Sequence, residues 1–123
     1  MSRGNQWAKA HTNLSVNSDA FWDFTWDEMG LSDLPANVDY VLAATKQPKL
    51  AYIGHSEGTT QAFAGFSKNQ TLASKVSLFV ALAPIAYVHH ASSPIFDLLA
   101  YLRVAELFKY FGMREFLPSG EQT

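Results

Sequence analysis

Short apolar runs alternate with a helix-like segment in the central part of the chain. Residues 49–53 form a compact apolar run typical of a buried β-strand, and residues 77–83 form a second, uninterrupted run. A continuous run of this kind is the pattern of a strand covered on both faces of a parallel sheet. Between the two runs, residues 59–67 have the small and aromatic side chains of a packed helix. Strand, helix and strand in this order predict a right-handed βαβ unit, and therefore an α/β fold.

The segment before the first strand is less regular. Polar and aromatic residues alternate up to Trp26, which indicates loops and not one continuous element. From Asp33 onward, apolar residues repeat at helical spacing. Asp33 is a suitable N-cap and Pro35 suits a first helical turn, so we expect a helix to begin there. Pro48 is expected to separate this helix from the strand.

Two further apolar segments follow the second strand. Residues 94–102 and 104–111 each place their apolar side chains on one helical face, and the two faces point in roughly opposite directions. We therefore expect a break near Arg103. Two short apolar helices at this point favour an inserted cap, although helices that pack on the sheet are an open alternative. The expected organisation is a partial α/β core over residues 1–88 and the start of a helical cap over residues 89–123.

Composition places the chain among globular proteins. It has 123 residues, of which 48% are hydrophobic and 16% are charged. The net charge of −2 gives no electrostatic reason to expect a nucleic acid or an anionic membrane as partner. The sequence has no cysteine, which excludes disulfides, thiolate metal sites and thiol catalysis. We expect no transmembrane segment, because the longest apolar run, residues 78–88, is shorter than the roughly 20 residues that a bilayer requires. Residues 1–6 lack the apolar segment of a secretory signal, so no export address is expected in the sequence as written.

The motif with chemical content is Gly54-His55-Ser56-Glu57-Gly58, which stands between the first strand and the following helix. Strand, serine-bearing turn and helix together predict a nucleophile elbow, which holds a serine hydroxyl exposed in a strained turn. Gly54 and Gly58 are expected to leave room for the strand and the helix to pass closely. The backbone N–H of Glu57 is the expected oxyanion donor, and such a donor contributes about 3 kcal/mol to a transition state. The alternative is an ordinary turn that contains a serine.

The partners of a catalytic serine are harder to find. His11 lies in a predicted loop, and His55 is expected to be buried in the turn, where its ring cannot easily reach the neighbouring hydroxyl. His89 and His90 are adjacent, so in an extended segment they point in opposite directions and are not expected to serve one catalytic or metal site. Asp97 is more simply explained as part of a solvated helix face. No histidine follows it, so the acid and the imidazole of a triad are not identified.

Two glycosylation sequons begin at Asn13 and Asn69, both in predicted loops. Each is equally well explained as an uncoated polar turn. Their joint occurrence in exposed places favours a parent protein that follows the secretory route.

Several co-linear blocks resemble the acid lipase family, that is, the gastric and lysosomal lipases and their relatives. The first block, residues 3–8, contains an Arg-Gly-Asn motif, and the second, residues 21–29, ends in Asp-Glu-Met. The block at residues 52–60 contains the elbow. Two further blocks lie at residues 33–41 and 81–86. The resemblance implies an α/β-hydrolase fold and hydrolysis of triacylglycerols or sterol esters, with no cofactor and no metal. It also implies a cap that contacts lipid and a parent that is secreted, lysosomal or vacuolar.

The same resemblance assigns roles to residues. It carries Ser56 over as the nucleophile and the Glu57 backbone as an oxyanion donor. The family often has Gln where Glu57 stands, so a carboxylate here is compatible only if it points away from the oxyanion or is neutral. Complete members are much longer, with an upstream His-Gly oxyanion loop and a downstream Asp and His, and none of these is found. We therefore interpret the sequence as the central part of a lipase and expect the chain by itself to be inactive.

Two other functions stay open. One is a non-catalytic remnant that binds lipid or a protein partner, a reading that the missing base and acid favour. The chain is also compatible with another serine hydrolase of the same fold, such as a thioesterase or a peptidase, since the fold does not determine the substrate.

Overall fold

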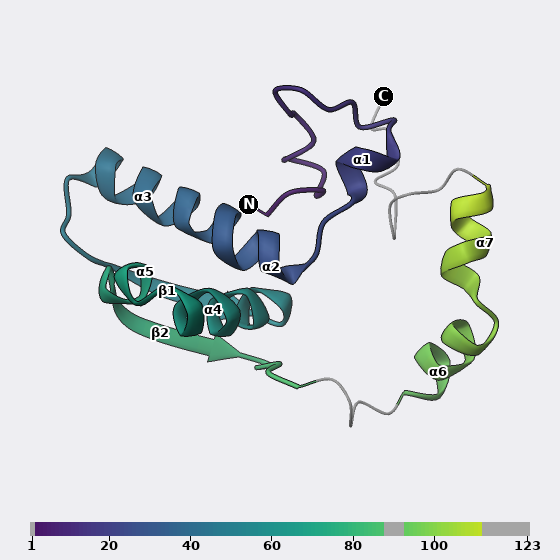
Figure 1. Cartoon of the computed structure of the whole chain (residues 1–123). Helices are drawn as coiled ribbons and strands as arrows, with labels where there is room; N and C mark the ends of the chain where they lie inside the picture. Colours follow the sequence, from purple (N-terminus) through teal and green to yellow (C-terminus); the bar gives the residue numbers. More distant parts are fainter. Residues whose placement is uncertain (1, 88–92, 112–123) are drawn as a thin grey trace, which may run out of the picture. The chain divides into compact units, whose positions relative to one another are not determined.

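The structure is a computed structural model that describes residues 2–87 and 93–111 (Figure 1). The chain divides into two compact units, Met1–Ala86 and Tyr87–Thr123. The first unit contains, in chain order, α1 (Asp19–Trp22), α2 (Trp26–Glu28), the π-helix η1 (Met29–Asp33), α3 (Leu34–Thr45), β1 (Leu50–His55), α4 (Glu57–Lys68), α5 (Gln70–Ser74) and β2 (Val76–Leu82). The second unit contains α6 (Pro94–Tyr101) and α7 (Val104–Tyr110).

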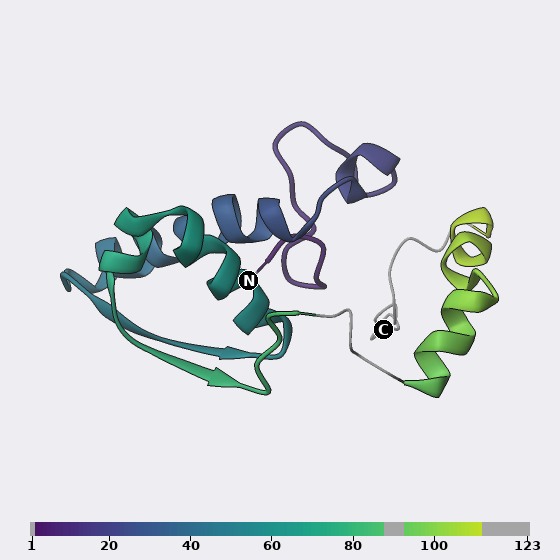
Figure 2. The ribbon, with the colours of Figure 1, turned by 60° about the horizontal axis from the view of Figure 1, so that its bottom comes forward.

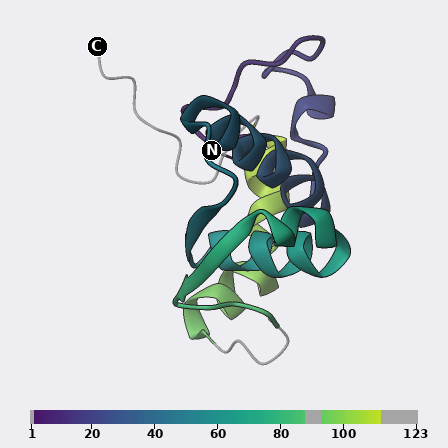
Figure 3. The same cartoon turned by 90° about the vertical axis from the view of Figure 1, so that its left-hand side faces the viewer.

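The two strands of the first unit are parallel neighbours, as predicted. Their register pairs Tyr52 with Phe79 and His55 with Leu82. The connection between them is helical, through α4 and α5. Helices α3, α4 and α5 lie on the same side of the strands (Figures 2 and 3). The α/β prediction is therefore confirmed as a small parallel sheet with one layer of helices.

The first unit leaves the opposite face of the sheet uncovered. Ile53 in β1 is 66% exposed, and Leu78 and Leu82 in β2 are 56% and 48% exposed. Alternate residues of a strand point to opposite faces, so these side chains lie away from the helices. The prediction of a strand covered on both faces is thus wrong within the first unit, because no element of that unit packs on this side.

The core lies between the helices and the covered face of the sheet. Leu34 and Val38 of α3 and Leu72 of α5 are buried together, and partly buried side chains surround them: Leu42, Leu50, Tyr52 and Phe66. Burial of each such aliphatic side chain stabilises the fold by about 2 kcal/mol. Next to them, four aromatic rings meet with centroids 5.4–5.8 Å apart, those of Tyr52, Phe63, Phe66 and Phe79. These rings join α4 to both strands.

The helix that contains α3 begins earlier than predicted. Thr25 caps α2 through a capping box, in which its N–H and hydroxyl both donate to the Glu28 carboxylate at 2.6 and 2.7 Å. These hydrogen bonds hold the pKa of Glu28 below its ordinary value. Asp33 has helical torsion angles and makes no capping hydrogen bond, so its predicted role as N-cap is wrong. Its carboxylate instead accepts hydrogen bonds from the Arg3 guanidinium at 2.7–3.1 Å and from the Arg3 N–H at 2.8 Å.

Two glycines allow η1 to pack tightly against α4. A Cβ added to Gly65 would lie 2.6 Å from the carbonyl oxygen of Gly30, and one added to Gly30 would lie 3.2 Å from the backbone of Gln61 and Gly65. Contacts of this length leave no room for a side chain at Gly65. The helical layer therefore depends on this small-residue crossing.

In the second unit, the predicted break between the helices is confirmed. Arg103 stands between α6 and α7 with φ of 52°, a left-handed conformation that ends a helix. Several large side chains are exposed within this unit, among them Leu98, Tyr101, Leu102 and Tyr110. None of the helices in the described part of the chain has the length and apolar character that crossing a membrane requires.

Candidate active site

The junction between β1 and α4 holds Ser56 in a strained turn. Ser56 directly follows the last residue of β1 and precedes the first residue of α4, with φ 52° and ψ −114°. A non-glycine residue pays about 1–3 kcal/mol for such a conformation. The Ser56 N–H donates to the carbonyl of Leu82 at 3.0 Å, which ties the turn to the end of β2. The strand, turn and helix predicted around the serine are all present.

The two glycines of the motif differ in what they contribute. A Cβ added to Gly54 would lie 2.8 Å from the carbonyl oxygen of Gly58, so the close approach of strand and helix requires a glycine there. Among the described residues, a Cβ added to Gly58 would meet only the Tyr52 hydroxyl, at 3.6 Å, which is an ordinary contact. The prediction that Gly58 is needed for space is therefore wrong for this part of the protein. Its carbonyl accepts a hydrogen bond from the Tyr52 hydroxyl at 2.9 Å, and burial raises the pKa of that tyrosine.

Glu57 is the first residue of α4, and its side chain turns along the helix. Its Oε1 accepts a hydrogen bond from Nε2 of the buried Gln61 at 2.8 Å, one helical turn further on. The first N–H groups of a helix have no intrahelical acceptor and carry the positive end of the helix dipole. The Glu57 N–H therefore belongs to a set of donors suited to an anion, while its carboxylate is held by Gln61.

Sequence reasoning missed two threonines that hold this junction together. The Thr59 hydroxyl donates to the Ser56 carbonyl at 2.6 Å and accepts the Ile85 N–H at 2.9 Å. The Thr60 hydroxyl donates to the Ile85 carbonyl at 2.8 Å. Both threonines lie in the sequence block that contains the elbow, but only the tertiary structure shows that the residues after β2 are their partners.

The histidines do not complete the site in the described residues. His55 is exposed, so the prediction that it is buried in the turn is wrong. It ends β1 and pairs in register with Leu82, which places it on the uncovered face of the sheet. His11 accepts the N–H groups of Asn13 and Leu14 through Nδ1, both at 3.0 Å, and so stabilises its own loop.

The other candidate partners belong to the second part of the chain. His89 and His90 lie outside the described residues. Asp97 is exposed in the first turn of α6, as expected for a solvated helix face. The hydrogen bonds that Ser56 makes with described residues come from its backbone groups. Within the described ranges, no group of three or more metal-ligating side chains is close enough to hold a metal ion.

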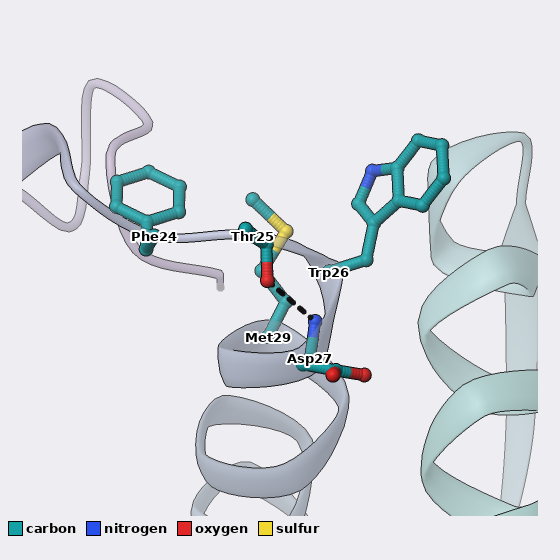
Figure 4. A pocket seen from close by; sticks show the side chains of 5 residues that line it. All are labelled: Phe24, Thr25, Trp26, Asp27 and Met29. Carbon is teal, nitrogen blue, oxygen red and sulfur yellow. Dashed lines mark hydrogen bonds between the residues drawn. The ribbon is translucent and has the colours of Figure 1, made fainter.

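A hollow of about 300 Å³ lies elsewhere in the first unit. It is lined by residues around the start of α2, namely Phe24, Thr25, Trp26, Asp27 and Met29 (Figure 4). The Thr25 hydroxyl inside it already accepts the Asp27 N–H at 3.2 Å. Ser56 does not line this hollow, so the hollow is not part of the candidate site.

The two sequon asparagines have different surroundings. Asn13 is exposed in the loop before α1. Asn69 is half-buried between α4 and α5, and its Oδ1 accepts the Leu72 N–H at 2.9 Å, which caps α5. The Asn13 side chain is therefore more exposed than that of Asn69, which is used in a helix cap.

Comparisons with known proteins give matches over nearly the whole chain. The family model of the alpha/beta hydrolase fold matches residues 2–114. The chain is 47% identical to lipase member M of Homo sapiens over 118 residues, which are 94% of this chain and 27% of that protein. It is 44% identical to the lysosomal acid lipase/cholesteryl ester hydrolase of Homo sapiens over 117 residues, and 48% identical to the gastric triacylglycerol lipase of Bos taurus over 118 residues. Each of these two matches covers 95% of this chain and 29% of the relative.

The chain thus spans less than a third of the length of these relatives. The resemblance to the gastric and lysosomal lipases is confirmed over nearly all of its own residues. Together with the parallel strands and the serine-bearing turn, the match shows that this chain belongs to the alpha/beta hydrolase fold family.

Proposed function

We propose that the protein carrying this chain is a lipase-type serine ester hydrolase, with Ser56 as its nucleophile. The observation that carries the proposal is the strained conformation of Ser56, with φ 52° at the junction of a parallel strand and a helix. Strain of this kind persists where the surrounding structure holds it, and it is concentrated at functional sites. The sequence similarity to proteins named as lipases supports the same assignment.

The reaction would proceed through an acyl-enzyme. Ser56 Oγ attacks the ester carbonyl carbon while a base takes its proton, and the carbonyl oxygen becomes an oxyanion beside the Glu57 N–H. The C–O bond to the alcohol then breaks, and the alcohol leaves with the proton from the base. Water attacks the acyl-serine and releases the fatty acid. The mechanism requires a histidine and an acid, which the described residues do not supply.

Neutral lipid esters are the proposed substrates. Relatives are named a cholesteryl ester hydrolase and a triacylglycerol lipase, so sterol esters and triacylglycerols are the two classes to test. Exposed apolar side chains on α6 and α7 support a cap role for residues 89–123, with contact to lipid. The exposed sequon at Asn13, with the lysosomal and gastric names of the relatives, supports a secreted, lysosomal or vacuolar location.

The product of the complete gene allows a direct test. Replacement Ser56→Ala is expected to lower kcat on a triacylglycerol by several orders of magnitude with little change in thermal stability. Ser67→Ala is the matched control, because Ser67 lies in the helix that follows Ser56, is exposed, and its hydroxyl donates to the Ala64 carbonyl one turn back. Hydrolysis that survives Ser56→Ala would contradict the proposed nucleophile. Activity on thioesters or peptides in preference to lipid esters would redirect the substrate assignment.

A further inference from the structure

Thr59 connects three backbone segments at the candidate site. Its side chain is fully buried, and its hydroxyl lies between the Ser56 carbonyl and the Ile85 N–H at 2.6 and 2.9 Å. Because the Ile85 N–H donates to this hydroxyl, the hydroxyl proton is directed to the Ser56 carbonyl. The Thr59 N–H donates to the same carbonyl at 2.9 Å. Two donors from one residue therefore fix the direction of this carbonyl.

The direction of that carbonyl determines the direction of a second group. The carbonyl of Ser56 and the N–H of Glu57 belong to one peptide unit, which is planar and trans. A rotation of this plane moves both groups together. An interaction that holds the Ser56 carbonyl on one side therefore holds the Glu57 N–H on the other side.

We propose that Thr59 is a positioning residue for oxyanion stabilisation. Its hydroxyl holds the Ser56–Glu57 peptide plane so that the Glu57 N–H points to the oxyanion of the tetrahedral intermediate. This inference rests on the proposed function, in which Ser56 forms that intermediate. An oxyanion donor acts mainly in the transition state, so loss of its alignment lowers kcat and leaves substrate binding nearly unchanged.

Thr60 provides an internal control for this role. Its hydroxyl donates to the Ile85 carbonyl at 2.8 Å, so it fastens the same segment after β2. Its hydroxyl bonds to Ile85 and not to the Ser56 carbonyl. A merely structural function of the two threonines, namely holding Ile85, would be shared by both.

The experiment compares Thr59→Val, Thr59→Ser and Thr60→Val in the product of the complete gene, with a soluble p-nitrophenyl ester as substrate. Thr59→Val keeps the shape and removes the hydroxyl, and we expect it to lower kcat by about 10-fold to 100-fold, less than outright deletion of an oxyanion donor. Its KM should stay within about 2-fold of the unchanged protein. Thr59→Ser restores the hydroxyl, and both it and Thr60→Val should keep kcat within about 3-fold.

A trifluoromethyl ketone gives a readout that a structural role would not affect. Ser56 adds to its carbonyl carbon and forms a stable tetrahedral oxyanion adduct, while the base takes the serine proton. Its affinity should fall in Thr59→Val by the same factor as kcat/KM and should be unchanged in Thr60→Val. Equal losses in the two valine variants, or a loss confined to KM, would overturn the positioning role.

Two further variants distinguish a folding defect of Thr59→Val, a wrong nucleophile and a wrong positioning role from one another. If Thr59→Val does not fold, the ratio of kcat between Thr59→Ser and Thr59→Ala replaces it, and a ratio near one would overturn the role of the hydroxyl. Ser56→Ala is measured in parallel. Retained activity in Ser56→Ala overturns the nucleophile and the positioning role together. An inactive Ser56→Ala with a fully active Thr59→Val overturns the positioning role alone.

Discussion

Two residues at the ends of the paired strands have left-handed backbone conformations although neither is glycine. Ser56 follows β1 with φ 52°, and Ala83 follows β2 with φ 47°. The Ser56 N–H reaches the Leu82 carbonyl, so the two strained turns are joined at the carboxyl end of the sheet. Ligands of open α/β sheets bind at this end of the strands. The strain is therefore located where a catalytic serine would be useful.

Gly54 is the residue whose replacement should disturb this geometry most directly. In Gly54→Ala the new Cβ would lie 2.8 Å from the Gly58 carbonyl oxygen and 3.0 Å from the Tyr52 ring, so strand and helix must separate. A displacement of a reacting group by about 1 Å can lower catalysis about 10²-fold. We expect a loss of this size in kcat of the complete gene product, together with a lower melting temperature. Full activity with unchanged stability would show that the close approach of strand and helix is dispensable.

Two contacts near Ser56 differ in how far the sequence predicts them. The related lipases often have Gln at the position of Glu57, and in this structure the Glu57 carboxylate accepts a hydrogen bond from Gln61, four residues further on. That spacing is visible in the sequence, because residues four apart are neighbours on a helix. The contact between Thr59 and Ile85 joins residues that are 26 positions apart, and no local pattern predicts it.

Among the elements, the strands, the central helix and the break at Arg103 follow from the hydrophobic pattern. Apolar runs and helical periodicity are local properties, and they specify which segments become strands and helices. The start of the first long helix was mispredicted because two capping signals compete. Thr25 and Glu28 form a capping box within four residues, while Asp33 binds Arg3, which lies 30 positions away. The sequence pattern does not reveal that Asp33 pairs with Arg3, so it predicts Asp33 as an N-cap.

The crossing of η1 and α4 allows a matched pair of substitutions. Gly65→Ala would place a Cβ 2.6 Å from the Gly30 carbonyl oxygen, and the resulting overpacking should lower the free energy of unfolding by about 1–3 kcal/mol. Gly58→Ala makes the same change in the same helix without a short contact, and it should raise that free energy by up to about 1 kcal/mol.

Thermal or denaturant unfolding of the two variants of the complete gene product measures both effects. Opposite signs would confirm that the crossing, and not helix propensity, determines the response at Gly65. Equal stabilisation in both variants would mean that the helices move apart without cost.

At the scale of the whole molecule, the described residues contain a strained serine, a helix N-terminus and an apolar unit after the second strand. Ile53, Leu78 and Leu82 leave one sheet face uncovered within the first unit, and neither a base nor an acid among the described residues bonds to Ser56. The sequence could not predict which face would lie open, because strand burial depends on neighbours and not on composition.

The central claim, that Ser56 is an activated nucleophile, is tested most directly by covalent labelling. A fluorophosphonate reacts with serines that a base has activated, and peptide mass spectrometry identifies the modified residue. In the product of the complete gene, we predict one adduct, on the peptide that contains Ser56, and no adduct there after Ser56→Ala. A product that hydrolyses esters but carries the adduct on a different serine would contradict the claim.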